Sequence, residues 1–175
     1  MEKKQFGDEE TTVKIRAIKT GDEQELTRLV AEFRVTLAKL RGNVYPLNNL
    51  NASDELSEFT QKQFPIFVAE GDNSSLLGYL VCRVDGDVVW VEALYVRPQY
   101  RRRGIGSALF AEAERVAREK GSDTLYNWVD PNNHEIIGLL QKRGYDVLNL
   151  IEVRHLHKAE KLSHNIVVGS HIFNH

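Results

Sequence analysis

The chain has 175 residues, 42% of them hydrophobic, which is enough for one compact domain with a single core. It carries 23 Lys and Arg against 25 Asp and Glu, a formal net charge of −2, which argues against a protein that binds nucleic acid through a general basic surface. Cys82 is the single cysteine, so no disulfide can form within the chain, and this favours a reducing, cytoplasmic setting. The N-terminal residues are polar and no apolar run reaches the ~18 residues of a membrane helix, so we expect neither export nor membrane association.

The first half of the chain predicts strands and helices in alternation. Residues 1–12 carry mixed charge with little apolar surface, and they predict a flexible N-terminal tail. Hydrophobic periodicity then predicts strands over 13–18, 66–70, 76–84 and 88–96, and helices over 22–40 and 54–63. The strands over 66–70 and 76–84 flank the turn-forming residues 71–75, which indicates an antiparallel hairpin.

The second half continues the alternation. We expect helices over 105–120 and 132–143, and strands over 124–129 and 145–153. This order predicts one α/β domain over 13–157, with a mixed sheet flanked by helices. Residues 158–175 form a C-terminal extension for which the pattern assigns no structure.

The stretch from Arg101 to Gly106 has the composition of an anion site. Gly104 and Gly106 lack a Cβ, so a ligand can approach the backbone closely there. The N–H groups at the start of the following helix have no partner within the helix, and the helix dipole favours negative charge at this end. Arg101, Arg102 and Arg103 add positive charge, and their spacing with the glycines suits a pyrophosphate better than a nucleic-acid patch.

This stretch resembles the acetyl-CoA-binding motif of the GNAT (GCN5-related N-acetyltransferase) family, Arg/Gln-x-x-Gly-x-Gly/Ala, at Arg101, Gly104 and Gly106. The resemblance extends, in the order of elements, over roughly residues 13 to 154. Further matches to the family's usual pattern are the lead-in Leu94-Tyr95-Val96-Arg97-Pro98 and, downstream, Asn133, Leu139, Gly144 and Tyr145.

The resemblance implies a fold, an activity and a cofactor site. The fold would be a mostly antiparallel central sheet that splays at the cofactor cleft, where the backbone of Leu94 and Val96 is free to bond the pantetheine arm. The activity would be transfer of an acetyl group from acetyl-CoA to a primary amine by direct attack, without a metal. Asn133 would lie near the pantetheine or the sulfur, although a plain helix cap explains it equally well. The implied cofactor-binding residues are Leu94, Tyr95, Val96, Arg101, Arg102, Arg103, Gly104, Ile105, Gly106, Ser107 and Asn133.

Glu92 is the candidate catalytic base, because many relatives place an acidic residue two positions before the Leu-x-Val pair. We predict that it shares a strand face with Leu94 and Val96 and removes the acceptor's proton through a water molecule. The alternative is a carboxylate that pairs with an arginine or lysine on the sheet face.

Leu140 departs from the family pattern, since it stands where many relatives have a tyrosine that acts as general acid. The thiolate would then leave with help from water and the helix-end field, or Tyr126 or Tyr145 would donate the proton. This departure also leaves open a rival, a catalytically impaired module that binds acyl-CoA for regulation.

Other features of the sequence receive no catalytic role. His155 and His157 alternate on the predicted strand 145–153 and its continuation, but no further ligand stands at a metal-binding spacing beside them. Trp90 and Trp128 suit either an acceptor pocket or the core. The insert 44–63 would cover the acceptor side of the cleft, but it does not identify the acceptor, small molecule or protein. A homodimer is expected from the resemblance alone.

Overall fold

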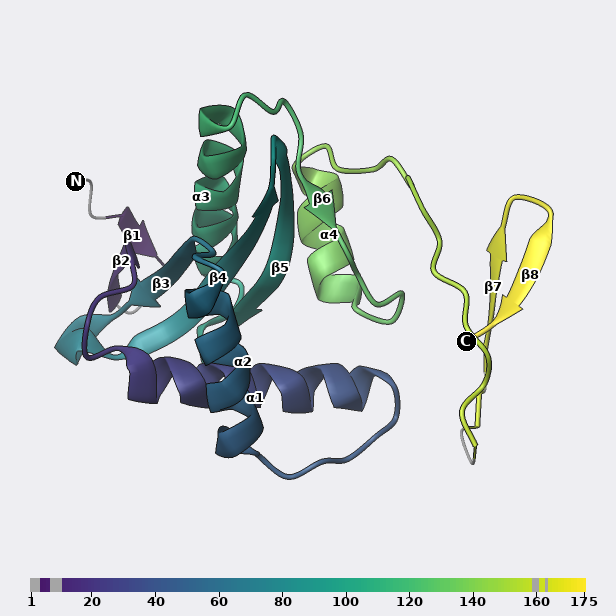
Figure 1. Cartoon of the computed structure of the whole chain (residues 1–175), viewed down its shortest axis with the longest axis horizontal. Coiled ribbons are helices and arrows are strands. Elements are labelled where there is room, and N and C mark those ends of the chain that lie inside the picture. Colours follow the sequence, from purple (N-terminus) through teal and green to yellow (C-terminus); the bar gives the residue numbers. More distant parts are fainter. Residues whose placement is uncertain (1–3, 7–10, 159–160, 163) are drawn as a thin grey trace. The chain divides into compact units, whose positions relative to one another are not determined.

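A computed structural model describes residues 4–6, 11–158, 161–162 and 164–175 (Figure 1). The chain divides into two compact units, residues 1–143 and residues 144–175. The first unit contains the central sheet and its helices, and the second contains a small hairpin. In the described part of the chain, no helix combines the length and the apolar character needed to cross a membrane.

The first unit is built on a six-stranded sheet with the order β1-β2-β3-β4-β5-β6. All neighbours are antiparallel except β5 and β6, which run parallel. The strands are β1 (Lys4–Phe6), β2 (Thr11–Ala17), β3 (Ile66–Glu70), β4 (Leu76–Asp85), β5 (Val88–Val96) and β6 (Tyr126–Asn127). The predicted mixed, mostly antiparallel α/β sheet is therefore confirmed.

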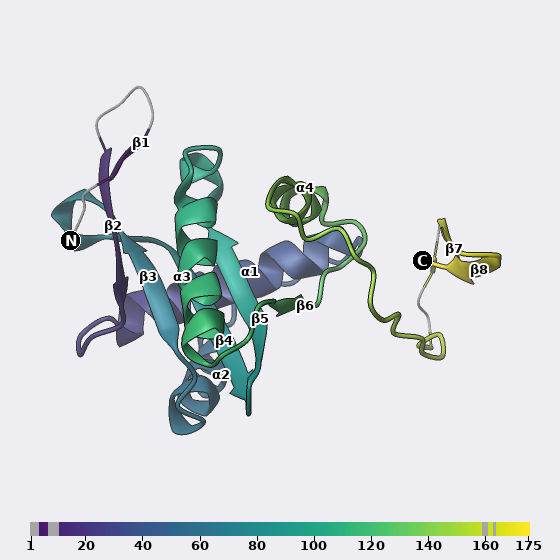
Figure 2. The same cartoon turned by 90° about the horizontal axis from the view of Figure 1, so that it is seen from above.

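Helices cover both faces of this sheet. On one face, α1 (Glu23–Leu40) is crossed by α2 (Asn49–Gln61), and their apolar sides pack with Tyr79, Val81 and Tyr95 in the main core (Figure 1). On the other face lies α3 (Ile105–Glu119), which contacts β3, β4 and β5 (Figure 2). The last helix of the unit, α4 (His134–Lys142), is tied to α3 by the ion pair between Arg143 and Glu114.

The sheet opens between β5 and β6. The two strands are paired only at Trp90 with Tyr126 and at Val91 with Asn127. From Glu92 to Val96, β5 continues without a strand partner on this side among the described residues. Backbone donors and acceptors along this part of β5 are therefore available to another molecule.

A β-bulge changes the direction of Glu92. On β4, Val81 is opposite Ala93 and the next residue, Cys82, is opposite Val91, so Glu92 is the extra residue of β5. A bulge interrupts the alternation of side chains along a strand. The prediction that Glu92 shares a face with Leu94 and Val96 is therefore wrong: Glu92 forms an ion pair with Arg83 on the face covered by α1 and α2.

Most predicted elements are present, with shifted ends. The second helix begins at Asn49 because the side chain of Asn48 accepts a hydrogen bond from Asn51 N–H and caps it. The predicted tail contains β1, which pairs with β2, and the rest of the tail before Thr11 lies outside the described residues. The short 3₁₀ turns are η1 (Asp72–Ser74) and η2 (Pro98–Tyr100).

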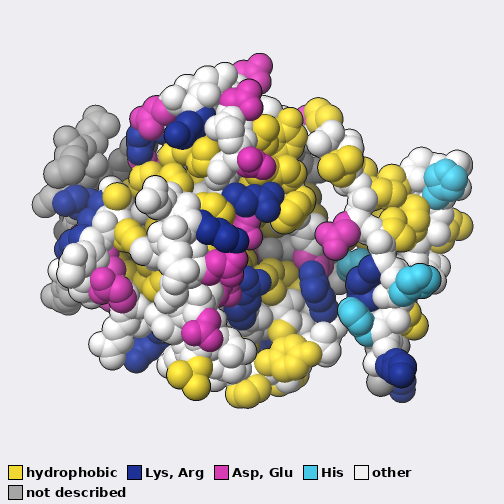
Figure 3. Space-filling view, viewed as in Figure 1, with side chains coloured by type: hydrophobic (Ala, Val, Ile, Leu, Met, Phe, Trp, Pro, Cys, Tyr) yellow, Lys and Arg dark blue, Asp and Glu magenta, His cyan; other side chains and the backbone are white. Residues whose placement is uncertain are grey.

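The second unit differs from its prediction. Residues 145–153, predicted as a strand, have no regular secondary structure, and His155 and His157 therefore do not lie on a strand. A two-stranded hairpin follows, made of β7 (Asn165–Val168) and β8 (His171–Asn174). Exposed hydrophobic side chains in this unit include Val147 and Leu150. Figure 3 shows hydrophobic side chains at the surface in yellow.

A buried ion network fastens β2 to its neighbours. Arg16 donates hydrogen bonds to Asp22 at 2.6 Å and to Glu70 at 2.9 Å. The side chains of Arg16 and Glu70 are only 11% and 13% exposed. Hydrogen bonds from Arg16 lower the pKa of Glu70 from 4.5 to about 2 and also lower the pKa of Asp22.

Candidate active site

The loop between β5 and α3 adopts a conformation that gathers backbone N–H groups. Arg102 and Gly104 have positive φ angles of 61° and 81°, and Ile105 begins the helix. Arg101, before them, is extended with φ −68° and ψ 166°. Left-handed residues in such a loop can turn neighbouring N–H groups toward one point, which makes a concavity for an anion. The conformation at Gly104 costs a glycine little, which explains the residue at this position.

The N–H groups of this loop are free to bind an anion. In the described part of the chain, those of residues 102–107 have no hydrogen-bond acceptor, and no side chain caps α3. By contrast, α2 and α4 are both capped by an asparagine side chain. The geometry therefore fits the phosphates of a nucleotide cofactor, which would occupy the N-terminus of α3.

The three arginines of the loop have different surroundings. Arg101 donates from its backbone N–H to Pro98 C=O, from Nε to Val96 C=O at 2.9 Å, and from Nη1 to Glu135 at 2.7 Å. Arg103 lies over the ring of Tyr100 at 5.8 Å. Within the described ranges, neither Arg102 nor Arg103 forms an ion pair, so their charges remain available to an anion.

The end of β5 is the predicted contact with the pantetheine arm. Val96 is nearly buried and its carbonyl accepts from Arg101, whereas Tyr95 is buried in the core under α1. Leu94 precedes them on the part of β5 that β6 does not pair. Ser107 and Ile105 are in the first turn of α3, beside this strand end.

Asn133 lies at the N-cap of α4, where its side chain accepts from Ile136 N–H at 3.3 Å. The cap occupies the side-chain oxygen and leaves the amide NH₂ as a donor. The two roles considered for Asn133 are therefore compatible.

Glu92 and Arg83 form a partly buried pair. Their side chains are 26% and 30% exposed, and Arg83 Nε lies 3.8 Å from Glu92 Oε2. This oxygen is buried and has no hydrogen-bond partner in the described residues. Glu92 therefore pairs with an arginine, as the alternative from the sequence stated. Its Oε2 has no hydrogen-bond partner among the described residues and can still accept a hydrogen bond from a bound water.

An aromatic stack around Arg83 was missed by the sequence argument. The guanidinium lies 5.0 Å from the ring centre of Trp90 and 4.6 Å from that of Trp128. Trp90 in turn lies 4.9 Å from the ring of Tyr126. The stack joins β4, β5 and the residue after β6, and only the β4–β5 register could have indicated that Arg83 meets Trp90.

Two further observations limit the chemistry that the described residues can perform. No three His, Cys, Asp or Glu side chains among them are placed to hold a metal ion. Cys82 is fully buried, and burial raises the pKa of its thiol to about 12. A thiol in this state is a poor nucleophile.

Comparison with known proteins identifies the family. A model described as the acetyltransferase (GNAT) family matches residues 35–145, more than half of the chain. The chain belongs to the GNAT acetyltransferase family. This GNAT protein is an N-acetyltransferase, and acetyl-CoA is its acetyl donor.

Relatives of the GNAT protein act on several amines, according to their names. It is 27% identical to the thialysine N-epsilon-acetyltransferase of Bos taurus over 161 residues, which cover 85% of this chain and 92% of that protein. It is 26% identical to the spermidine N(1)-acetyltransferase of Thermoplasma acidophilum over 82 residues, 47% of this chain and 51% of the other. Among solved structures, aminoglycoside acetyltransferase AAC(6')-Iy with a bisubstrate CoA analogue has a TM-score of 0.64 at 18% identity, covering 83% of this chain and 98% of that chain. The last similarity concerns the fold alone.

Proposed function

We propose that the protein acetylates a primary amine of a small molecule by direct attack on acetyl-CoA bound at the loop 101–107. The observation that carries the proposal is the set of unpartnered N–H groups of residues 102–107 beside the unpaired end of β5. These are the groups that a pyrophosphate and a pantetheine arm require.

The proposed cofactor site uses backbone more than side chains. The N–H groups from Arg102 to Ser107 would hold the pyrophosphate, with Arg102 and Arg103 adding charge. Arg101 would connect the loop to β5 and α4, and its Nη2 keeps its donors for a phosphate oxygen. Leu94, Tyr95 and Val96 would contribute main-chain groups to the pantetheine, and the amide NH₂ of Asn133 would face the same arm.

Glu92 acts in this proposal as the base for the acceptor. An ammonium group cannot attack a thioester, so a proton must first leave the nitrogen. A water bound to the unpartnered Oε2 of Glu92 would take this proton. The nitrogen then forms a bond to the acetyl carbon, the carbon–sulfur bond breaks, and the electron pair leaves with the sulfur of CoA. The second proton of the nitrogen passes through water to the thiolate, which gives the amide and CoA.

Direct attack is supported by the state of the single cysteine. An acyl-enzyme would need an accessible nucleophile, and Cys82 is buried with a raised pKa. The Cys82 thiol lies on the face of the sheet that α3 covers, because the charges of Glu112 and Arg115 on that helix act on its pKa. Glu92 lies toward the other face. The cytoplasmic setting expected from this thiol remains part of the proposal.

The test is calorimetric titration with acetyl-CoA and CoA at two salt concentrations, followed by measurement of CoA release with a panel of amines. We expect binding that weakens with salt, and loss of binding in Gly104→Asp, which fills the close approach and adds negative charge. Unchanged affinity in this variant would refute the cofactor site. Binding without CoA release for any amine would favour the regulatory module instead.

We also propose a homodimer. The support is the exposure of apolar side chains in the second unit, such as Val147 at 87% and Leu150 at 73%, because a second copy could cover them. Light scattering after size-exclusion chromatography tests this. A monomer at micromolar concentration would contradict it.

A further inference from the structure

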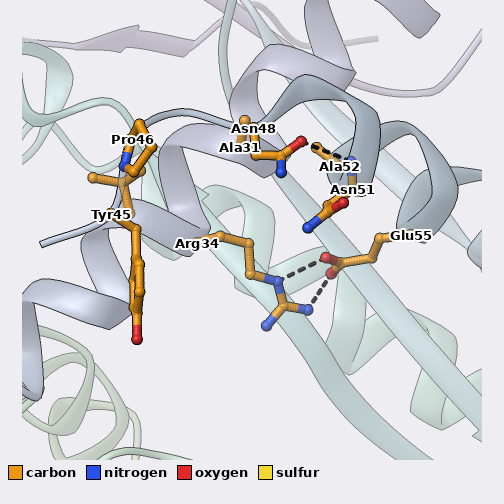
Figure 4. Close-up of a pocket in the computed structure, with 9 residues that line it drawn as sticks. Ala31, Arg34, Tyr45, Pro46, Asn48, Asn51, Ala52 and Glu55 are labelled. Atoms are coloured by element: carbon orange, nitrogen blue, oxygen red, sulfur yellow. Dashed lines mark hydrogen bonds and ion pairs between the residues drawn. The ribbon is translucent and has the colours of Figure 1, made fainter. Parts of the chain in front are cut away.

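A cavity of about 570 Å³ lies between α1, the connection 41–48 and α2. Its walls include Arg34 from α1, Tyr45 from the connection, and Asn51 and Glu55 from α2 (Figure 4). This volume is in the range of small-molecule sites. The cavity is on the face of the sheet toward which Glu92 is directed.

The charged groups of the cavity form one ion pair. Arg34 Nε donates to Glu55 Oε2 at 2.7 Å, and Nη2 donates to Oε1, so the pair is bidentate (Figure 4). One edge of the guanidinium is thereby used, and in the described residues Nη1 has no acceptor. The Arg34 side chain is 54% exposed and that of Glu55 is 16% exposed, so the pair remains accessible to a ligand.

The charges of Glu55 and Glu92 both act on the guanidinium of Arg34. The hydrogen bonds that Arg34 donates to Glu55 raise the pKa of Arg34, and the charge of Glu92 acts in the same direction. In the core on the same face of the sheet, the fully buried hydroxyl of Tyr79 has no hydrogen-bond partner in the described residues. The pKa of Tyr79 is raised mainly by burial, and both Glu55 and Arg34 act on it. The cavity and Glu92 thus lie toward the same face of the sheet, which α1 and α2 cover.

We infer that the acceptor is an α-amino acid whose side chain carries the amine to be acetylated. Its ammonium group would pair with Glu55 and its carboxylate with the free Nη1 edge of Arg34, which places four charges of alternating sign together. The side-chain amine would extend toward Glu92. This inference rests on the proposed function and names the substrate class of the same reaction.

The same charges disfavour a simple polyamine. Among the described residues that line the cavity, Glu55 is the only acidic one, and Arg34 neutralises it. A polyamine would gain one attraction and meet one repulsion there, and it has no group for Arg34. A zwitterionic head group satisfies both partners. Discrimination should therefore depend on the carboxylate of the acceptor.

The experiment compares acceptors that differ by one charged group. L-lysine is tested against 1,5-diaminopentane, which lacks the carboxylate, and against Nα-acetyl-lysine, which lacks the α-ammonium. L-ornithine and 1,4-diaminobutane form a second pair with a shorter side chain. We expect kcat/KM to be at least about tenfold higher for one of the amino acids than for its diamine.

Variants then assign the difference to the ion pair. Arg34→Gln should raise KM for the amino acid about tenfold or more and leave KM for acetyl-CoA unchanged. KM for the diamine should not rise, because this variant removes a repulsion and leaves the carboxylate of Glu55 unpaired. Arg34→Lys keeps the charge opposite Glu55 but loses the planar fork, so it should raise the same KM with little change in melting temperature. Lys62→Gln is the matched control, because it removes an exposed ion pair with Glu58 on the same helix α2 and should change neither KM.

The outcomes separate this inference from the proposed function. Equal kcat/KM for amino acid and diamine, with equal effects of Arg34→Gln on both, would overturn the amino-acid acceptor and leave the acetyltransferase proposal standing. Acetyl-CoA binding without transfer to any amine would overturn both. A higher kcat/KM for the amino acid that disappears in Arg34→Gln would support both.

Discussion

Gly104 and Gly106 are two residues apart, yet replacement by alanine should have opposite effects on stability. At Gly104 the φ angle is 81°, and the left-handed conformation costs a residue with a Cβ about 1–2 kcal/mol. At Gly106 a Cβ would lie 3.8 Å from Leu139 and 3.9 Å from Val96, which are ordinary contacts. Alanine is also favoured over glycine inside a helix by about 0.5–1 kcal/mol.

The two variants should therefore differ by about 2 kcal/mol in their free energy of unfolding. Urea denaturation should show Gly106→Ala above the wild type and Gly104→Ala below it. Calorimetric titration should show acetyl-CoA binding kept in Gly106→Ala, since the family motif accepts alanine there. If Gly104→Ala relaxes the loop, binding must restore the strained conformation and should weaken about 5- to 30-fold. A Gly104→Ala protein that is as stable as the wild type and binds acetyl-CoA equally would refute the argument.

Three other predictions concern proton transfer and acid stability. Glu92→Gln should lower the acetylation rate at neutral pH with little change in acetyl-CoA affinity, and an unaltered pH–rate profile would remove Glu92 from the mechanism. Arg16→Gln should lower the free energy of unfolding by about 3 kcal/mol at pH 7, because Asp22 and Glu70 lose the guanidinium between them and keep only their contacts with Lys19. Since the pKa of Glu70 is lowered from 4.5 to about 2, the wild type should keep this stabilisation above pH 4.5 and lose it as the pH falls toward 2, which urea titrations across this range would detect. Tyr126→Phe should leave kcat unchanged if the thiolate leaves unprotonated, whereas a loss of more than about a hundredfold would identify Tyr126 as the acid.

Local patterns predicted the framework of the fold well. The helices α1, α3 and α4 have apolar residues at intervals of three and four, and glycines in the left-handed conformation follow each of them. The hairpin of β3 and β4 and the strand β5 were also indicated by apolar runs between turn residues. The loop proposed to bind phosphate could be found because its three arginines and two glycines lie between Arg101 and Gly106. Each of these signals lies within about twenty residues, so one sequence is sufficient to show it.

Features that depend on pairing between distant segments were not predictable. The face of Glu92 depends on a bulge, which is set by the register of β4 against β5. The stack of Trp90 and Trp128 around Arg83 joins three segments of the chain. The ion pair of Arg34 with Glu55 likewise requires α2 to cross α1. Apolar residues 145–153 have strand-like composition, but a strand forms only where an edge is available to pair.

A buried leucine at position 140 is compatible with catalysis, because protonating the departing thiolate is less important than removing the proton of the acceptor's ammonium group. Leu140 is 7% exposed and cannot donate a proton. A thiol has an ordinary pKa of about 8.5, so a thiolate near neutral pH is a tolerable leaving group without an acid. A lysine-type amine has a pKa of about 10.4, so only roughly one molecule in a thousand is neutral at pH 7.4. Removal of the ammonium proton is therefore the larger obstacle. In the proposed mechanism Glu92 removes this proton through a water, because its buried Oε2 has no hydrogen-bond partner among the described residues.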